Sequence, residues 1–163
     1  LLAYGCASEP VPAWVHGADL VACPPRPDGA RACLGSRPGA DATGISLYAD
    51  DMPLFTVSDD LVLSFDYRAG PEMTWVGVWL KDRTSDSEQQ GTLLPGDGTW
   101  KHVEVALTDV RPVGRNQVRM QPGDVITRLT IQGLPGSEQL QIANIAVRRV
   151  PGRPAGTGFL AAP

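Results

Sequence analysis

The sequence predicts an all-β protein, an antiparallel β-sandwich of the jelly-roll type. Short runs of residues alternate between apolar and polar side chains, which is the period of a half-buried strand. The 18 glycines and 15 prolines fall largely between these runs, as the turns of a sandwich require. No stretch combines helical periodicity with capping residues. Long connections between the strands favour a jelly roll over a simple meander.

Residues 61–81 hold the clearest pattern and predict two strands joined by a turn at residues 69–72. In the first strand, alternate apolar side chains face the core, so Asp66 and Arg68 point away from it. We expect the two strands to pair as a hairpin, with their outward side chains on one surface.

The second strand of this hairpin carries two tryptophans on its outer face. Apolar residues at positions 76, 78 and 80 complete the core face, so Trp75 and Trp79 point the other way, with Gly77 between them. Two indoles on the outer face of a sheet require a second layer, a partner or a ligand. Burial beneath the polar segment 82–99 is the alternative to a ligand, because tryptophans are mostly buried.

The N-terminal part of the chain is expected to be a leader or linker over residues 1–13, followed by a sandwich domain over residues 14–150. Proline and the lack of periodicity mark the leader. Before the hairpin, the alternation predicts strands at residues 18–23, 30–34 and 45–49, and an edge segment at 54–57.

After the hairpin, residues 82–99 are expected to form a long polar loop with a short strand near 91–94. Further strands are predicted at residues 100–108, 125–133 and 139–149, and Gln132 points outward. The apolar phase changes near Ala143 and Asn144, which predicts a β-bulge. Residues 151–163 are rich in Gly, Pro and Ala and are expected to be a tail or linker.

Two of the three cysteines flank a turn segment, residues 24–29. Cys23 and Cys33 are expected on adjacent antiparallel strands, close enough for a disulfide, which would imply an exported protein. Two buried thiols are the alternative. Cys6 is then unpaired, either as the lipidated cysteine of an export signal or as part of a preceding linker.

Composition and motifs exclude several classes of function. The formal charge is −4 and no basic stripe offsets it, which argues against a nucleic-acid partner. No apolar run is long enough to cross a membrane, so no transmembrane segment is expected. No nucleophile elbow, metal-binding histidine cluster or P-loop occurs, so Asp66 and Glu104 are the remaining candidates for a catalytic carboxylate pair.

Five segments, taken in their order along the chain, carry a resemblance to a known family of modules. They are LSFDYR, WVGVWL, Trp100 followed by KHVEVAL, DVITRLTIQGL and LQIANIAVRR. The chain resembles the galactose-binding-like β-sandwich carbohydrate-binding modules of extracellular glycoside hydrolases, over residues 14–150. The resemblance implies a non-catalytic module outside the cell or on its surface. It also implies a polysaccharide or oligosaccharide ligand and a neighbouring catalytic domain.

The resemblance also implies a sugar-binding site either on the open face of one sheet or at loops on the edge of the sandwich, and the outward tryptophans favour the open face. Sugars stack their apolar C–H faces on aromatic rings and need planar polar groups for their hydroxyls. Trp75 and Trp79 would supply the rings, and Asp66, Arg68 and Gln132 the polar groups. Two alternatives remain open: a structural or adhesive module packed on a neighbouring domain, and a jelly-roll enzyme that acts on glycans.

Many of these modules hold a structural calcium ion, with an acidic residue just before the asparagine of the last strand. Here Ala143 stands at that position, before Asn144. Calcium prefers six or more oxygen ligands, so Asn144 would need carboxylates such as Asp19, Asp50 or Asp51 nearby. Solvated surface carboxylates are the alternative for all three aspartates.

Overall fold

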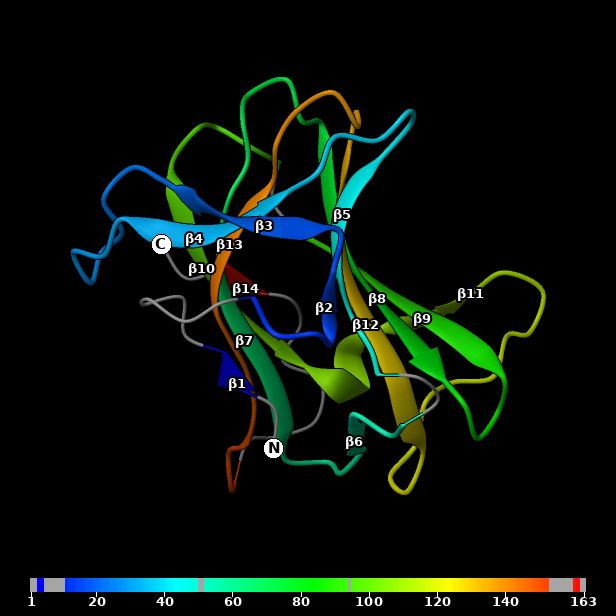
Figure 1. The fold of residues 1–163 in the computed structure, drawn as a ribbon. Coiled ribbons are helices and arrows are strands. Elements are labelled where there is room, and N and C mark those ends of the chain that lie inside the picture. The colour runs from blue at the N-terminus through cyan, green and yellow to red at the C-terminus, as the bar shows by residue number, and fades with distance from the viewer. Residues whose placement is uncertain (1–2, 5–10, 50–51, 94, 153–159, 162–163) are drawn as a thin grey trace.

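The computed structural model describes residues 3–4, 11–49, 52–93, 95–152 and 160–161. Cys6, Asp50, Asp51 and most of the expected leader and tail lie outside these residues. In the part of the chain that the structure describes, two antiparallel seven-stranded sheets pack face to face (Figure 1). The predicted all-β sandwich is therefore confirmed.

Sheet A has the strand order β14-β10-β7-β13-β4-β3, with β1 beside β13. Its strands are β1 (Ala3–Tyr4), β3 (Ala18–Ala22), β4 (Ala32–Ser36), β7 (Leu61–Arg68), β10 (Trp100–Ala106), β13 (Gln141–Arg149) and β14 (Leu160–Ala161). The short strands β1 and β14 belong to the segments expected as leader and tail.

Sheet B has the order β11-β9-β8-β12-β5-β2, with β6 beside β12. Its strands are β2 (Val15–His16), β5 (Thr43–Leu47), β6 (Phe55–Thr56), β8 (Trp75–Asp82), β9 (Ser87–Thr92), β11 (Arg111–Val113) and β12 (Val125–Leu134). A 3₁₀ turn, η1 (Leu107–Asp109), follows β10. Among the described residues, no helix has the length and apolar character needed to cross a membrane.

The core lies between the two sheets and is built from the inward positions that alternation predicts. Phe65 and Tyr67 from β7 and Val78 from β8 are completely buried. Val103 and Val105, alternate residues of β10, are buried as well. Each such side chain contributes about 1.5–3 kcal/mol of burial free energy, so the alternating pattern fixes which face of each strand points inward.

The expected hairpin of β7 and β8 is wrong. β7 pairs with β10 and β13 in sheet A, whereas β8 pairs with β9 and β12 in sheet B. Residues 69–74 carry the chain from one sheet to the other. Met73 in this connection is completely buried, and its Sδ would lie 2.2 Å from a Cβ at Gly133 of β12. The connection is thus anchored in the core, and the outward side chains of β7 and β8 lie on opposite surfaces.

The middle of the expected long loop at residues 82–99 is a strand, β9. β9 pairs with β8 as a hairpin and begins at Ser87, earlier than the strand expected near residues 91–94. The buried carboxylate of Asp82 organises the turn, because it accepts hydrogen bonds from the backbone of Thr84 and from the hydroxyl of Ser85 (2.8 and 2.5 Å). This segment extends sheet B beside the tryptophans of β8.

The predicted bulge in β13 is confirmed. The register with β7 shifts between Ala143 and Ala146, and Asn144 has a φ of 53°. A second shift, between Ile126 and Arg128 of β12, was not predicted. It turns Ile126 into the core, whereas the preceding Val125 is partly exposed.

The predicted disulfide is not formed: Cys23 and Cys33 are both thiols and both are buried. Cys33 lies directly opposite Val21, while the amide of Cys23 donates to the carbonyl of Arg31 (2.9 Å). The two cysteines therefore occupy diagonal positions, about 7–8 Å apart in an antiparallel pair. That separation exceeds the usual Cα distance across a disulfide.

Candidate functional site

The candidate site is the outer face of sheet B. Strand pairing places a row of side chains across it, since residues directly opposite each other share a face. Trp79 of β8 lies between Gln90 of β9 and Thr130 of β12. Thr130 lies opposite Ser46 of β5, which lies opposite His16 of β2. The row carries an aromatic ring on β8, hydroxyls at its middle and an imidazole at its far end.

Trp75 lies along its own strand and covers Gly77. A Cβ at Gly77 would be 2.3 Å from Cη2 of the Trp75 indole, so only glycine leaves room for this arrangement. Gly77 is buried although it lies on the outer face, while Trp75 and Trp79 are both partly exposed. The two indoles therefore form one aromatic strip along β8, as their spacing predicts.

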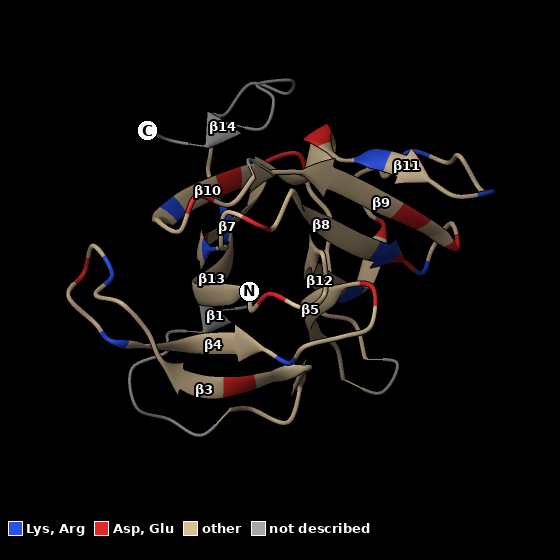
Figure 2. Ribbon diagram, turned by 90° about the horizontal axis from the view of Figure 1, so that it is seen from above, with Lys and Arg blue, Asp and Glu red and all other residues tan. Residues whose placement is uncertain are grey.

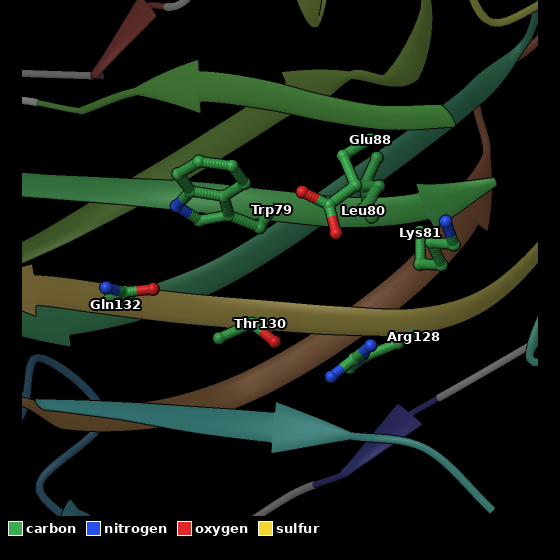
Figure 3. A pocket seen from close by; sticks show the side chains of 7 residues that line it. All are labelled: Trp79, Leu80, Lys81, Glu88, Arg128, Thr130 and Gln132. Carbon is green, nitrogen blue, oxygen red and sulfur yellow. The ribbon is translucent and has the colours of Figure 1, made fainter. Parts of the chain in front are cut away.

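A hollow of about 170 Å³ lies beside this strip. It is lined by Trp79, Leu80, Lys81, Glu88, Arg128, Thr130 and Gln132. In Figure 3 the indole of Trp79 presents its face outward over β8, and Gln132 lies on the neighbouring strand β12. Trp75, Trp79 and Gln132, three of the side chains predicted as ligand-binding, are thus brought together on one surface.

The hollow continues toward the turn between β8 and β9. A second hollow of about 520 Å³ is lined by Lys81, Arg83, Asp86, Thr127 and Arg128. Lys81 and Arg128 line both hollows, so we name the two together the β8–β12 groove. The four residue steps from Trp79 to Arg83 span about 13 Å, which makes the groove long enough for more than one sugar unit.

Planar groups are held in place at the far side of the groove. The rings of His16 and Tyr48 are stacked 3.8 Å apart at 12°, and the His16 Nε2–H donates to the carbonyl of Tyr48 (3.1 Å). The guanidinium of Arg128 lies over the Tyr48 ring at 5.9 Å. These contacts restrict the side chains before a ligand arrives, which reduces the entropy lost on binding.

Polar groups of the groove are partly paired with each other. The hydroxyls of Ser46 and Thr130 share a hydrogen bond (2.8 Å). Lys81 Nζ lies 2.6 Å from Asp86, and this hydrogen bond lowers the pKa of the Asp86 carboxyl. Trp79 Nε1 is buried without an acceptor among the described residues. Such a donor requires water or a ligand to satisfy it.

Asp66 and Arg68, the other two predicted ligand-binding residues, lie on the outer face of sheet A. Asp66 accepts hydrogen bonds from His102 Nδ1 and from Asn144 Nδ2, each 2.7 Å long. Arg68 donates to the carbonyl of Gly98 (2.7 Å). The core separates them from the tryptophans, so the five residues do not form one site as expected.

The carboxylates considered for catalysis do not face each other across a cleft. Asp66 and Glu104 lie on the same outer face of sheet A, on neighbouring strands, with His102 between them. The His102 ring bonds to Asp66 and lies 4.0 Å from Glu104, which forms an ion pair with Arg148. Within this network both carboxylates have a structural partner.

The residues considered for calcium are engaged elsewhere. Asn144 points its amide nitrogen, a donor, toward Asp66, and Asp19 binds the guanidinium of Arg37 (2.6 Å). Among the described residues, no three His, Cys, Asp or Glu side chains are grouped to hold a metal ion. Asp50 and Asp51 lie outside the described residues, and the described ones do not fit a calcium site.

Several residues of this surface were not anticipated from the sequence. His16, Ser46, Tyr48 and Gln90 join the site only because of the strand order β9-β8-β12-β5-β2. The available signal was alternation, since Ser46 is the outward residue between the buried Ile45 and Leu47. That signal gives the side of the strand but not its neighbours.

The fold defined by these two sheets is a β-sandwich that matches those of carbohydrate-binding modules. No protein-family model and no curated protein matches the chain. Among solved structures, a family 11 carbohydrate-binding module from Clostridium thermocellum in complex with a β-1,3-1,4-mixed-linked tetrasaccharide is similar. Its TM-score is 0.54 at 15% identity, over 83% of this chain and 85% of that one. A family 29 module gives a TM-score of 0.50 at 16% identity, over 89% and 87%.

A region of an exo-β-agarase is also similar. The TM-score is 0.61 at 14% identity, over 91% of this chain and 25% of the agarase chain. A second agarase gives 0.59 at 12% identity, over 91% and 26%. The chain thus spans about a quarter of the length of the agarases that it matches. At these identities the likeness establishes the fold.

Proposed function

We propose that this protein is a non-catalytic carbohydrate-binding module that binds a polysaccharide on the outer face of sheet B. The observation that carries the proposal is the aromatic strip of Trp75 and Trp79 beside an open groove lined by polar side chains. A pyranose ring offers an apolar C–H face to an indole, and its hydroxyls pair with planar polar groups such as Gln132.

The shape of the site favours a chain over a single sugar. The β8–β12 groove is open to solvent and continues from Trp79 to Arg83. Each aromatic contact supplies about 1 kcal/mol, so one sugar unit gains little. Several units together would give dissociation constants of roughly micromolar to millimolar.

The similar solved structures also support a carbohydrate-binding role. The similar structures that match along most of both chains are carbohydrate-binding modules. The match to a quarter of an agarase chain is consistent with a module attached to a larger enzyme that acts on polysaccharides. We further propose that such a parent enzyme works outside the cell or on its surface.

The test is polysaccharide binding by variants of the two outer faces. Affinity electrophoresis in gels that contain agarose or mixed-linked β-1,3-1,4-glucan measures retardation, and calorimetry measures the dissociation constant. Trp79→Ala is expected to weaken binding about fivefold or more. Asp66→Asn, on the outer face of sheet A, serves as the matched control and should bind like the wild type.

The stability of these variants separates a binding role from a structural one. Because Trp79 is partly exposed, Trp79→Ala should lose much less than the roughly 3–5 kcal/mol that a core aromatic loses. Trp79→Phe keeps a ring if the alanine variant fails to fold. Equal binding by wild type, Trp79→Phe and Trp79→Ala, or loss of binding in Asp66→Asn alone, would refute the proposal.

A structural or adhesive module is the second candidate. Leu134 is 36% exposed and lies directly opposite Trp75, which adds an apolar side chain to the strip. An interface with a neighbouring domain would bury this strip. The polar lining of the groove favours the carbohydrate ligand, and absence of binding to every polysaccharide would favour the interface.

A further inference from the structure

Basic side chains gather on the outer face of sheet B of an otherwise acidic molecule. Figure 2 shows blue segments on β11 and toward one end of β8 and β12. The basic residues that line the groove or point outward on these strands are Lys81, Arg83, Arg111 and Arg128. The acidic residues there are Asp86 and Glu88. This face has two more basic than acidic groups, although the chain has 14 basic and 18 acidic residues. The rest of the chain then has ten basic and sixteen acidic residues.

Arg128 is the best placed of these cations to meet a ligand. It lines both hollows of the groove and is exposed. Its Cζ lies over the Tyr48 ring, 5.9 Å from the ring centroid, so a cation–π interaction helps to hold the guanidinium at this side of the groove. The charge of Lys81 is offset by Asp86 at 2.6 Å.

The position of Arg128 relative to Trp79 suits a substituted sugar. Trp79 lies opposite Thr130, and Arg128 is two residues further along β12, opposite Lys81. Two residues along a strand span about 7 Å. In Figure 3 the indole of Trp79 extends toward Gln132 and Arg128 lies on the other side of Thr130, so the next unit of a chain stacked on Trp79 can reach the guanidinium.

We propose that the β8–β12 groove selects polysaccharides that carry anionic groups, either sulfate esters or uronate carboxylates, and that Arg128 binds those groups. The inference rests on the proposed function and names the chemical class of its ligand. The planar fork of a guanidinium matches two oxygens of a sulfate or carboxylate. The net negative charge of the molecule would repel an anionic chain. The positive charge around Arg128 would attract such a chain to this face.

The experiment compares polymers that differ only in charge. Carrageenan is compared with the same polymer after desulfation, and polygalacturonate with its methyl ester, by affinity electrophoresis and calorimetry. At about 0.02 M NaCl the charged member of at least one pair should bind about tenfold more tightly, and at about 0.5 M NaCl screening should remove most of that difference. The pair that shows the effect identifies sulfate or carboxylate as the group recognised.

Variants assign the effect to Arg128. Arg128→Gln should weaken binding of the charged polymer about fivefold to tenfold and leave binding of the neutral one unchanged. Arg128→Lys keeps the charge but loses the fork, and an intermediate affinity is expected. Arg31→Gln makes the same change in charge at an exposed position between β3 and β4, in the other sheet, and should have no effect.

The outcomes separate this inference from the proposed function. Equal binding of charged and neutral polymers, or wild-type binding by Arg128→Gln, overturns the anionic preference while a Trp79-dependent affinity for neutral chains still stands. If no charged or neutral polysaccharide binds, the proposed function and this inference both fail. Loss of the preference in Arg31→Gln to the same extent would show a general charge effect and would also overturn the role of Arg128.

Discussion

Gly77 determines how the aromatic strip is built. The residue lies between Trp75 and Trp79, and its missing side chain leaves the surface of β8 free for the indole of Trp75. An isolated tryptophan side chain on a strand stands roughly perpendicular to the sheet. Here it lies along the strand, so its ring adds to the flat surface that begins at Trp79.

Gly77→Ala should therefore move an aromatic ring. The added Cβ would lie 2.3 Å from the Trp75 ring and 3.0 Å from the carbonyl oxygen of Gly91, and the ring is the group that can shift. We expect a red shift of tryptophan fluorescence, weaker polysaccharide binding, and a loss of about 1–3 kcal/mol in stability from the added crowding. In a Trp75→Phe background the shift in emission should disappear. Unchanged emission and binding would contradict this arrangement.

The register of β3 and β4 makes a prediction about cysteine chemistry. Val21 lies directly opposite Cys33, whereas Cys23 occupies the diagonal position. Val21→Cys, combined with Cys23→Ser, should form a disulfide with Cys33 on mild oxidation, because a direct antiparallel pair matches the Cα distance that the bond requires. Peptide mapping after alkylation without reductant measures it. A disulfide between Cys23 and Cys33 in the wild type would contradict the register.

The bulge of β13 depends on Asn144. With a φ of 53°, this residue is in the left-handed region, which asparagine and glycine adopt more readily than alanine. Asn144→Ala should therefore be less stable than Asn144→Gly by about 1 kcal/mol, although both lose the hydrogen bond to Asp66. Chemical denaturation measures the difference. Equal stability of the two variants would show that the backbone conformation contributes nothing.

For a single strand, the sequence predicts which side chains face the core, but it does not predict which strands lie beside it. The side of a strand that is buried depends on local alternation, so the outward positions of Trp75, Trp79 and Gln132 could be predicted. The neighbours of a strand depend on contacts with distant segments, which alternation does not encode. Asp66 and Arg68 were thus assigned to the correct side of β7 but to the wrong surface of the molecule.

The same explanation holds for the residues of the site that the sequence did not predict. His16 and Ser46 approach Trp79 only through β12, from which β5 is separated by more than seventy residues of sequence. Nothing near either residue marks it as part of a site. The bulge at Asn144 was predictable because the apolar phase itself changes there, within one strand.

The stability of the whole molecule should decline in acid. Hydrogen bonds from Arg37, Arg26, Lys81 and Lys101 lower the pKa values of Asp19, Asp28, Asp86 and Asp97, respectively. A carboxyl whose pKa is lower in the folded state stabilises the fold above its unfolded pKa of about 3.9, and this contribution is lost as the pH falls through the folded value. The melting temperature should therefore drop steadily below about pH 4.

Asp97 provides the matched variant for this pH dependence. Its carboxylate accepts hydrogen bonds from the backbone and side chain of Thr99 (2.9 and 2.6 Å) and lies 2.5 Å from Lys101. Asp97→Asn should lower the melting temperature near neutral pH, and its difference from the wild type should shrink as the pH falls. A difference that is independent of pH would show that the charge of Asp97 does not contribute.

The passage of the chain from sheet A to sheet B after β7 has a consequence for how fast the protein folds. Since β7 and β8 do not pair with each other, the core is closed by partners distant in sequence, such as β5 with β12 and β4 with β13. Forming them requires large loops to close before much surface is buried. Refolding, followed by stopped-flow fluorescence, should therefore take about milliseconds to seconds. During that time the strand edges are still unpaired. Because β12 and β13 pair with strands that are distant in sequence, whereas β9 forms a hairpin with β8, substitutions in β12 and β13 should slow folding more than substitutions in β9.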